Sequence, residues 1–222
     1  GKTAAEFVIP DGVQTVEKNA FYYAVGLEKI GVPASVNVLG ERVFGTCLSL
    51  REIAVDDKNT SYRSRNGDLY SADSSTLLQY AIGKENAEFV STDDVKSIAE
   101  GAFEHAKLLK KATLSATLTG IGKGAFKDCT ALAEVMLPDS LKSVGAEAFS
   151  GCTALKKVTI PASVESIGIG AFRGSALESA VFEETEGWVA GGDRHLSADS
   201  LANPSTASTF LTDAYVGDEW SR

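Results

Sequence analysis

The chain has 222 residues, of which 44% are hydrophobic, and it carries a formal net charge of -9. With a mean hydropathy near zero, this composition supports a globular core and excludes a wholly disordered chain. The acidic balance argues against nucleic acid as a partner, because binding to a phosphate backbone depends on clustered Lys and Arg. No apolar run in the sequence is long enough to predict a membrane span.

A repeat with a period of 23 residues organises most of the chain. The intervals between its aligned phenylalanines are 23, 59, 23, 23 and 23 residues, and 59 is one period plus an insertion of 36. Apolar residues also stand five and eight positions before each phenylalanine. A fixed period with apolar columns predicts a solenoid, because each unit can bury its hydrophobic face only against its neighbours. The aligned residues are Phe21, Phe44, Phe103, Phe126, Phe149 and Phe172.

Each repeat divides into a strand and a return segment. The pattern of Leu155, Val158 and Ile160 predicts a strand with alternate residues turned inward and the residues between them exposed on an open parallel sheet. A proline after most of these strands ends the pairing there. The Gly-x-x-Ala-Phe segment is expected to form a short helical or irregular return, and its phenylalanines a continuous buried stack. The fold class predicted is therefore an α/β repeat solenoid.

We divide the chain into a solenoid of about six repeats over 1–182 and a C-terminal cap with an irregular tail over 183–222. The insertion, at about 54–87, contains two turn signals, Asn66-Gly67 and 71–75. The segments 68–70 and 76–80 alternate in hydrophobicity well enough to pair. We interpret the insertion as a β-hairpin that projects from the solenoid, and a dedicated ligand-binding lobe is the alternative.

The two ends of the array need different explanations. An open solenoid end exposes its core and requires a cap, and Trp188 and Tyr215 are the best candidates to fill it. The stretch from Asp193 to Ser208 is rich in Ser, Ala and Asp and is expected to be an exposed loop. At the other end, the segment 7–10 is expected to be a strand that lacks its preceding return segment, so the chain is expected to begin within the array.

The three cysteines occupy one column of the repeat, three residues after the phenylalanine. Because the other residues in that column are Ala or Ser, the position requires a small side chain, and buried free thiols are the favoured interpretation. A disulfide between Cys129 and Cys152 is the first alternative, although stacked parallel side chains do not give its dihedral by default. A metal site that includes Cys47 is the second alternative.

Other candidate chemical sites are weak. The glycines from Gly120 to Gly124 resemble a phosphate loop, but they lack the required spacing, and Gly122 and Gly124 fall in columns that are glycine in other repeats. A calcium loop counted from Asp57 lacks the central glycine and the final glutamate. His105 lies at a variable position, and His195 lies beside Ser and Asp residues in the irregular tail. We therefore predict no catalytic residue, no metal and no cofactor.

The residue pattern of the repeat is specific enough to suggest a family. Residues 162–172, ASVESIGIGAF, closely resemble the repeat of the BspA-like leucine-rich-repeat proteins of bacterial surfaces, and the resemblance covers nearly all of residues 7–182. It implies a leucine-rich-repeat solenoid with a parallel sheet on one face. It also implies a secreted or bacterial cell-surface protein, with any export signal outside these residues, and adhesion to matrix proteins or other cells as the best-known role.

The leading hypothesis is therefore a non-catalytic, monomeric binding module for protein or glycan on host or neighbouring cells. A structural spacer that presents another domain is the alternative, and a hydrolase is a third. We expect contacts on the sheet face, although charged columns could simply keep that face soluble. The candidate residues are Lys29, Arg51, Glu52, Lys110, Lys111, Glu134, Met136, Lys156, Lys157 and Thr159.

Overall fold

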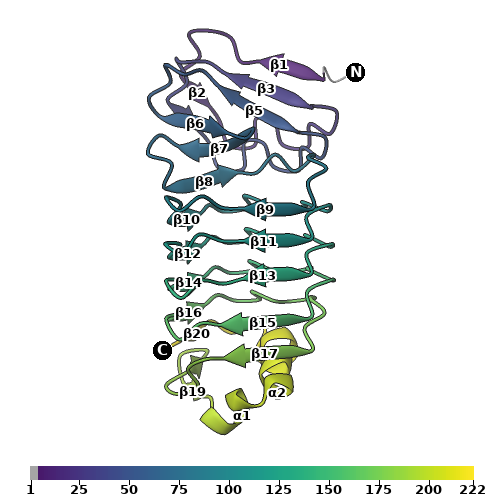
Figure 1. Cartoon of the computed structure of the whole chain (residues 1–222), viewed down its shortest axis with the longest axis vertical. Helices are drawn as coiled ribbons and strands as arrows, with labels where there is room; N and C mark the ends of the chain where they lie inside the picture. The colour runs from purple at the N-terminus through teal and green to yellow at the C-terminus, as the bar shows by residue number, and fades with distance from the viewer. Residues whose placement is uncertain (1–4) are drawn as a thin grey trace.

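The computed structural model describes residues 5–222, so residues 1–4 of the predicted solenoid lie outside the described part. Successive coils stack along the long axis of the molecule, with the N-terminal coils at one end and two short helices at the other (Figure 1). The predicted leucine-rich-repeat solenoid is confirmed. Its return segments are turns, and within residues 5–222 α-helix occurs only near the C-terminus.

The longer strands of the coils form the predicted parallel sheet face. Residues 23 apart face each other, as in Ile30 opposite Ile53 and Ala112 opposite Val135. The pairing is interrupted, giving the groups β1-β3-β5, β9-β11-β13 and β15-β17. These strands are β1 (Glu6–Val8), β3 (Lys29–Val32), β5 (Glu52–Val55), β9 (Glu88–Val90), β11 (Lys111–Thr113), β13 (Glu134–Met136), β15 (Lys157–Ile160) and β17 (Ser179–Phe182).

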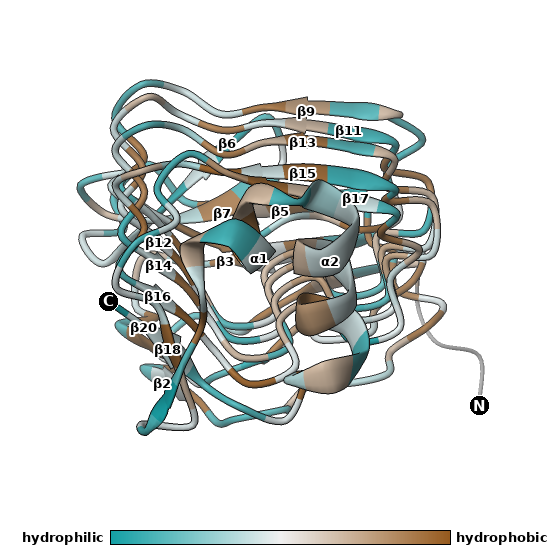
Figure 2. Cartoon of the chain, turned by 90° about the horizontal axis from the view of Figure 1, so that it is seen from below, coloured by the Kyte–Doolittle hydropathy of each residue, from teal (hydrophilic) through white to brown (hydrophobic). Residues whose placement is uncertain are grey.

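A second sheet, which the sequence analysis did not predict and which is parallel in its central strands, runs along an adjacent side of the coil (Figure 2). Most of its strands have two residues, which is too short for an alternating pattern to be recognised in the sequence. Its pairing is parallel from β8 to β16 and antiparallel toward both ends. Its strands are β6 (Tyr62–Arg65), β7 (Asp68–Ser71), β8 (Thr76–Gln79), β10 (Ser97–Ile98), β12 (Gly120–Ile121), β14 (Ser143–Val144), β16 (Ser166–Ile167), β18 (Val189–Ala190), β19 (Arg194–His195) and β20 (Trp220–Ser221). In the N-terminal coils, β2 (Thr15–Val16) and β4 (Val38–Leu39) form a separate parallel pair.

The predicted aromatic stack forms the centre of the core. The rings of Phe103, Phe126, Phe149 and Phe172 are fully buried and nearly parallel, with centroids 4.6 to 5.3 Å apart. Tyr80 continues this stack, 4.9 Å from Phe103. Because Tyr80 lies 23 residues before Phe103, the interval of 59 contains a further coil, and the true insertion is 13 residues rather than 36.

Glycines in one column allow the coils to approach each other closely. A Cβ atom on Gly145 would lie 2.6 Å from the carbonyl carbon of Gly122, and one on Gly168 would lie 2.3 Å from the backbone nitrogen of Ala146. Real Cβ atoms do not approach backbone atoms so closely. Packing between coils therefore explains these glycines, and a phosphate loop is not required.

The insertion contains the predicted strand pair but does not project from the solenoid. Strands β7 (Asp68–Ser71) and β8 pair as predicted, β6 (Tyr62–Arg65) pairs with β7, and β8 joins the second sheet beside β10. The buried Asn59 side chain donates hydrogen bonds to the carbonyl oxygens of Pro33 and Val36, at 2.9 and 2.8 Å. The insertion is thus built into the stack between the second and third predicted repeats.

The C-terminal segment caps the solenoid. Trp188 fills the end of the core as predicted, but Trp220 is the second fully buried side chain there and Tyr215 is only partly buried. The predicted exposed loop is wrong: it contains α1 (Ala198–Ala202) and most of α2 (Pro204–Thr209), which a π-helical turn (Phe210–Ala214) follows. The helices lie across the open end of the coil, with Leu201 and Ala207 buried (Figure 2).

Candidate binding face

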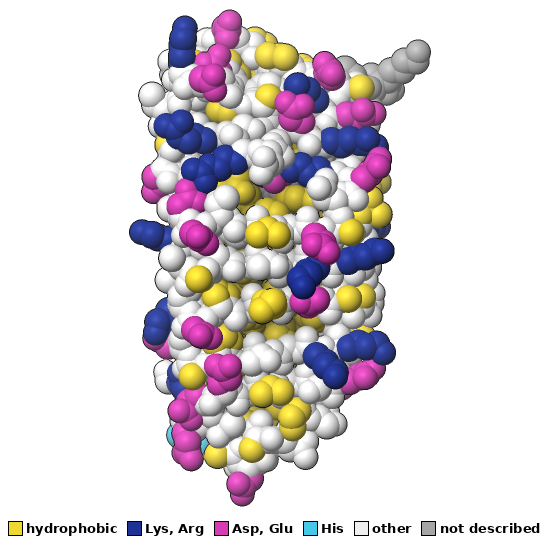
Figure 3. All heavy atoms as spheres, in the orientation of Figure 1, with side chains coloured by type: hydrophobic (Ala, Val, Ile, Leu, Met, Phe, Trp, Pro, Cys, Tyr) yellow, Lys and Arg dark blue, Asp and Glu magenta, His cyan; other side chains and the backbone are white. Residues whose placement is uncertain are grey.

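The sheet face carries a line of residues along the C-terminal repeats in which exposed apolar side chains alternate with threonines. Val90, Thr113 and Met136 are aligned across β9, β11 and β13, and Thr159 and Val181 continue the column on β15 and β17. The exposed fractions of Val90, Met136 and Val181 are 67%, 58% and 42%. Figure 3 shows apolar side chains along the middle of this face. We call these five residues the apolar stripe.

A column of alternating charge runs beside the apolar stripe. It consists of Glu88, Lys111, Glu134 and Lys157, one residue on each of four successive strands. Lys111 Nζ lies 2.6 Å from Glu134 Oε1, and this hydrogen bond raises the pKa of Lys111. We call these four residues the charge ladder. Because neighbouring charges offset each other, this side of the face has little net charge.

The ten predicted contact residues all lie in or directly before the strands of the sheet face, but they form two groups. Lys29, Arg51 and Glu52 belong to the N-terminal strands, and the other seven belong to β11, β13 and β15 or the residue before them. The two groups are separated by the break between β5 and β9. The sequence places both groups on one face and does not reveal this break.

Most of the predicted lysines are paired with glutamates of the next coil. Besides Lys111, Lys29 lies 2.9 Å from Glu52, and Lys156 lies 3.0 Å from Glu178. Such exposed pairs contribute little to stability, but they reduce the positive charge available to a partner. Arg51 is also paired, 3.2 Å from Glu85, whereas Lys110 and Lys157 form no ion pair with the described residues.

Sequence reasoning missed Val90 and Val181, two of the most exposed members of the apolar stripe. Both lie in the column of Met136, which was identified, so extending that column through every strand would have found them.

The three cysteines are buried and free, as the favoured interpretation predicted. Each thiol donates a hydrogen bond to the carbonyl oxygen of the stacked phenylalanine one coil earlier, at 3.0 Å for Cys129 and 3.1 Å for Cys152. Burial raises the pKa of Cys47 to about 11 and that of Cys152 to about 12. Because the thiolate is the nucleophile and the metal ligand, these residues suit packing rather than chemistry.

The two histidines and the segment near Asp57 show no arrangement that indicates catalysis or metal binding. His105 stands at a turn position with a φ of 64°, and His195 lies exposed on the two-residue strand β19. Near Asp57, the Asn59 side chain turns inward to bind the backbone of an adjacent coil. Among residues 5–222, no three His, Cys, Asp or Glu side chains gather in a way that could hold a metal ion.

The comparisons with known proteins agree with this architecture. The crystal structure of the pneumococcal vaccine antigen PcpA is 28% identical, with a TM-score of 0.72 over 80% of this chain and 50% of that one. A leucine rich cell surface protein from Faecalibacterium prausnitzii is 22% identical, with a TM-score of 0.68 over 82% of this chain and 60% of that one, which supports the fold alone. The chain thus spans 50% and 60% of these two proteins.

The remaining comparisons concern membrane spans and family membership. No helix in residues 5–222 has the length and hydrophobicity needed to cross a membrane, and no curated protein matches the sequence. The model of the BspA type leucine rich repeat region matches residues 2–66 and 80–187 in six copies. The chain therefore belongs to the BspA-type leucine-rich-repeat family.

Proposed function

We propose that the chain is a non-catalytic binding module of a secreted or surface-displayed bacterial protein, and that it binds a protein partner through the apolar stripe. The observation that carries this proposal is the line of exposed Val90, Met136 and Val181 along the sheet face. Contiguous exposed apolar surface is unusual on a soluble protein and commonly marks an interaction site. Membership of a surface-protein repeat family supports the proposed location.

The chemistry of the stripe favours a protein over a glycan. Its exposed apolar groups are aliphatic chains and one thioether, and Phe89 and Phe182, the aromatic residues of these strands, are buried. Aliphatic side chains gain most from contact with another apolar surface, and methionine adapts to irregular partners. A hydroxyl-rich glycan offers little such surface.

The predicted lysines have a secondary role in this proposal. Lys111 and Lys156 are paired with glutamates, so the free positive charges of the predicted set on the C-terminal repeats are Lys110 and Lys157. Charges at the rim of an interface mainly affect the association rate and its salt dependence. Reversing Lys110 and Lys157 should therefore slow association more than it speeds dissociation.

The test compares two matched triple variants on a panel of purified matrix proteins, a glycan array and intact cells. The stripe variant is Val90→Ser, Met136→Ser, Val181→Ser. The control variant replaces three apolar residues of similar exposure outside the strands, and its changes are Leu48→Ser, Leu108→Ser and Ile169→Ser. Surface plasmon resonance gives the affinity of each for the proteins that bind the unmodified chain.

The proposal predicts that the unmodified chain and the control variant bind at least one protein, and that the stripe variant loses at least about tenfold in affinity. Equal binding by the stripe variant would refute it. Binding restricted to glycans would reassign the partner class, and an absence of binding to the whole panel would support the spacer function instead.

A further inference from the structure

The sheet face contains an open strand edge at the break between β5 and β9. Tyr80 and Phe103 stack on adjacent coils, so the strands of those coils, β5 and β9, would be expected to pair. Instead, no Cα atom of the described strands β5 to β8 lies within 8 Å of a Cα atom of β9. Because paired strands lie about 4.8 Å apart, none of the described strands β5 to β8 pairs with β9 on this side.

The two sides of the break differ in their hydrogen bonding. The edge of β5 is occupied by the insertion, because Ile53 N–H donates to Gly67 O at 2.8 Å and Ser64 Oγ donates to Ile53 O at 2.5 Å. β9 pairs only with β11. In that register the backbone N–H and C=O groups of Glu88 and Val90 face the break, and they have no backbone partner among residues 5–222.

The structure of the insertion holds this break open. Lys84 Nζ donates to Asn66 O at 2.5 Å and to Asp68 Oδ1 at 2.6 Å, and Asp68 also accepts a hydrogen bond from Ala81 N–H at 2.8 Å. Asp68, at the centre of this network, is 3% exposed, and Lys84 is partly buried. These hydrogen bonds hold the wall of the insertion in place beside the edge of β9, and the break between them is a cleft in this structure.

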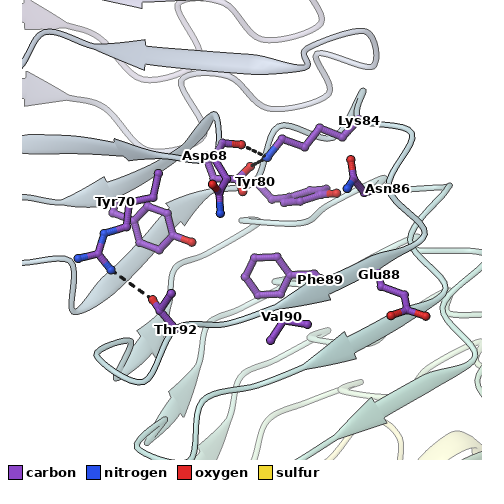
Figure 4. Close-up of a pocket in the computed structure, with 11 residues that line it drawn as sticks. Asp68, Tyr70, Tyr80, Lys84, Asn86, Glu88, Phe89, Val90 and Thr92 are labelled. Atoms are coloured by element: carbon purple, nitrogen blue, oxygen red, sulfur yellow. Dashed lines mark hydrogen bonds and ion pairs between the residues drawn. The ribbon is translucent and has the colours of Figure 1, made fainter.

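The cleft has a volume of about 490 Å³ and an aromatic floor. The floor consists of Tyr70, Tyr80 and Phe89, all less than 10% exposed. Figure 4 shows Tyr70 and Thr92 toward one end and Asn86 toward the other, with Phe89 between them. Figure 3 shows the same region as recessed apolar atoms between basic side chains.

One polar group in the wall of the cleft lacks a partner. The Tyr80 hydroxyl is buried without a hydrogen bond to any described residue, and it is directed toward Asn86 (Figure 4). An unpaired buried hydroxyl is costly. An occupant that displaces the exposed Asn86 side chain would reach this group.

From the open edge and the cleft, we propose that an extended peptide segment of a partner protein binds beside β9 as an added strand. The main chain of the peptide pairs with Glu88 and Val90, and alternate side chains face the aromatic floor. This mode of recognition obtains affinity from main-chain hydrogen bonds and specificity from the pockets under alternate residues. The inference rests on the proposed function only in taking the partner to be a protein. The two sites share Val90, whose side chain belongs to the apolar stripe and whose backbone borders the cleft, and their other residues differ.

The experiment selects seven-residue peptides from a phage-displayed random library on the full chain, with counter-selection against a Val90→Pro variant. Proline removes the Val90 N–H group, which faces the cleft, and leaves the pairing with β11 intact. Val90→Ala is the matched control, because it removes the side chain and retains the N–H group. Circular dichroism melting verifies that both variants fold.

Selected peptides are then synthesised with single N-methyl groups at each position, and their affinities are measured by fluorescence anisotropy. We expect N-methylation at alternate residues, and Val90→Pro, to lower affinity roughly five- to tenfold, the effect of one net hydrogen bond. We expect Val90→Ala, which retains the N–H group, to bind the peptides several-fold more tightly than Val90→Pro does. The N-methyl series leaves the protein unchanged, so it tests the proposal even if Val90→Pro fails to fold.

Three results would overturn the proposal. These are no enrichment of peptides over the counter-selection, N-methyl effects without an alternating period, or binding of a glycan in the cleft that Val90→Pro leaves unchanged. A Met136→Ser, Val181→Ser variant separates this proposal from the function proposed for the stripe. Peptide binding that persists in this variant supports the cleft site whatever the outcome of the matrix-protein panel.

Discussion

Truncating one ring of the aromatic stack should cost a large fraction of the stability of the protein. Phe149 is fully buried, with its ring 5.2 Å from that of Phe126 and 5.3 Å from that of Phe172. Phe149→Ala removes this buried area and leaves a cavity, which costs about 3–5 kcal/mol in other cores. Because the ring stacks on both sides, and stacked pairs add to area burial, we expect the upper half of this range.

The structure also predicts a gradient along the column that the sequence does not. Phe21 belongs to the same column, but it is only partly buried near the N-terminal end, and its ring lies tilted 5.8 Å from that of Phe44. Phe21→Ala should therefore cost about 1–2 kcal/mol. The sequence repeat alone would make the two substitutions equivalent.

Urea denaturation followed by circular dichroism measures both free energies of unfolding. The slope with respect to urea must be compared among variants, because repeat proteins can unfold in parts. Equal losses for the two variants, or a loss below about 2 kcal/mol for Phe149→Ala, would refute the tightly packed column.

Three further predictions concern strain and titration. Thr46 has a φ of 57° and a buried hydroxyl without a partner among the described residues. Thr46→Gly should therefore raise the free energy of unfolding, measured by thermal melts, by about 1–2 kcal/mol, and Thr46→Ala should raise it less. The folded-state pKa of Cys152, about 12, exceeds that of an unfolded thiol. The resulting stability should be fully present below about pH 8.5 and decrease as the pH rises toward 12. In a Cys152→Ala variant, the free energy of unfolding should fall less over this pH range. Hydrogen bonds from Ser71 and Ser75 lower the pKa of Asp73 to about 2, so stability present above about pH 3.9 should be lost as the pH falls through 2, and an NMR titration should show a higher pKa in Ser71→Ala.

The solenoid could be predicted from the sequence because its requirements repeat. Each phenylalanine, each small residue in the cysteine column and each close-packed glycine recurs at the same period, so the column identifies a packing role that one copy would not. The same reasoning explains Cys129 and Gly145 without chemical function. Tyr80 does not share the identity of the repeated phenylalanine, but its planar ring of similar size satisfies the same packing requirement.

The insertion and the cap could not be predicted in the same way, because each occurs once. Asn59 fixes the insertion to an earlier coil through hydrogen bonds to Pro33 and Val36, a long-range contact that leaves no periodic signal. The stretch 193–208 forms two short helices because Ser197 and Asn203 cap them, and its polar composition hid this structure. The proposed cleft site depends on such unrepeated features, so the sequence does not predict the break between β5 and β9.

The most direct test of the proposed binding face is oxidation of Met136. The chain contains a single methionine, which lies 58% exposed in the middle of the apolar stripe, whereas the three cysteines are buried. Mild peroxide therefore introduces one polar sulfoxide at the site, which mass spectrometry can quantify. For a matrix protein that binds the unmodified chain, we predict about a tenfold loss of affinity after oxidation and recovery after treatment with methionine sulfoxide reductases. Unchanged affinity of the fully oxidised protein would contradict the assignment of the sheet face as the binding surface.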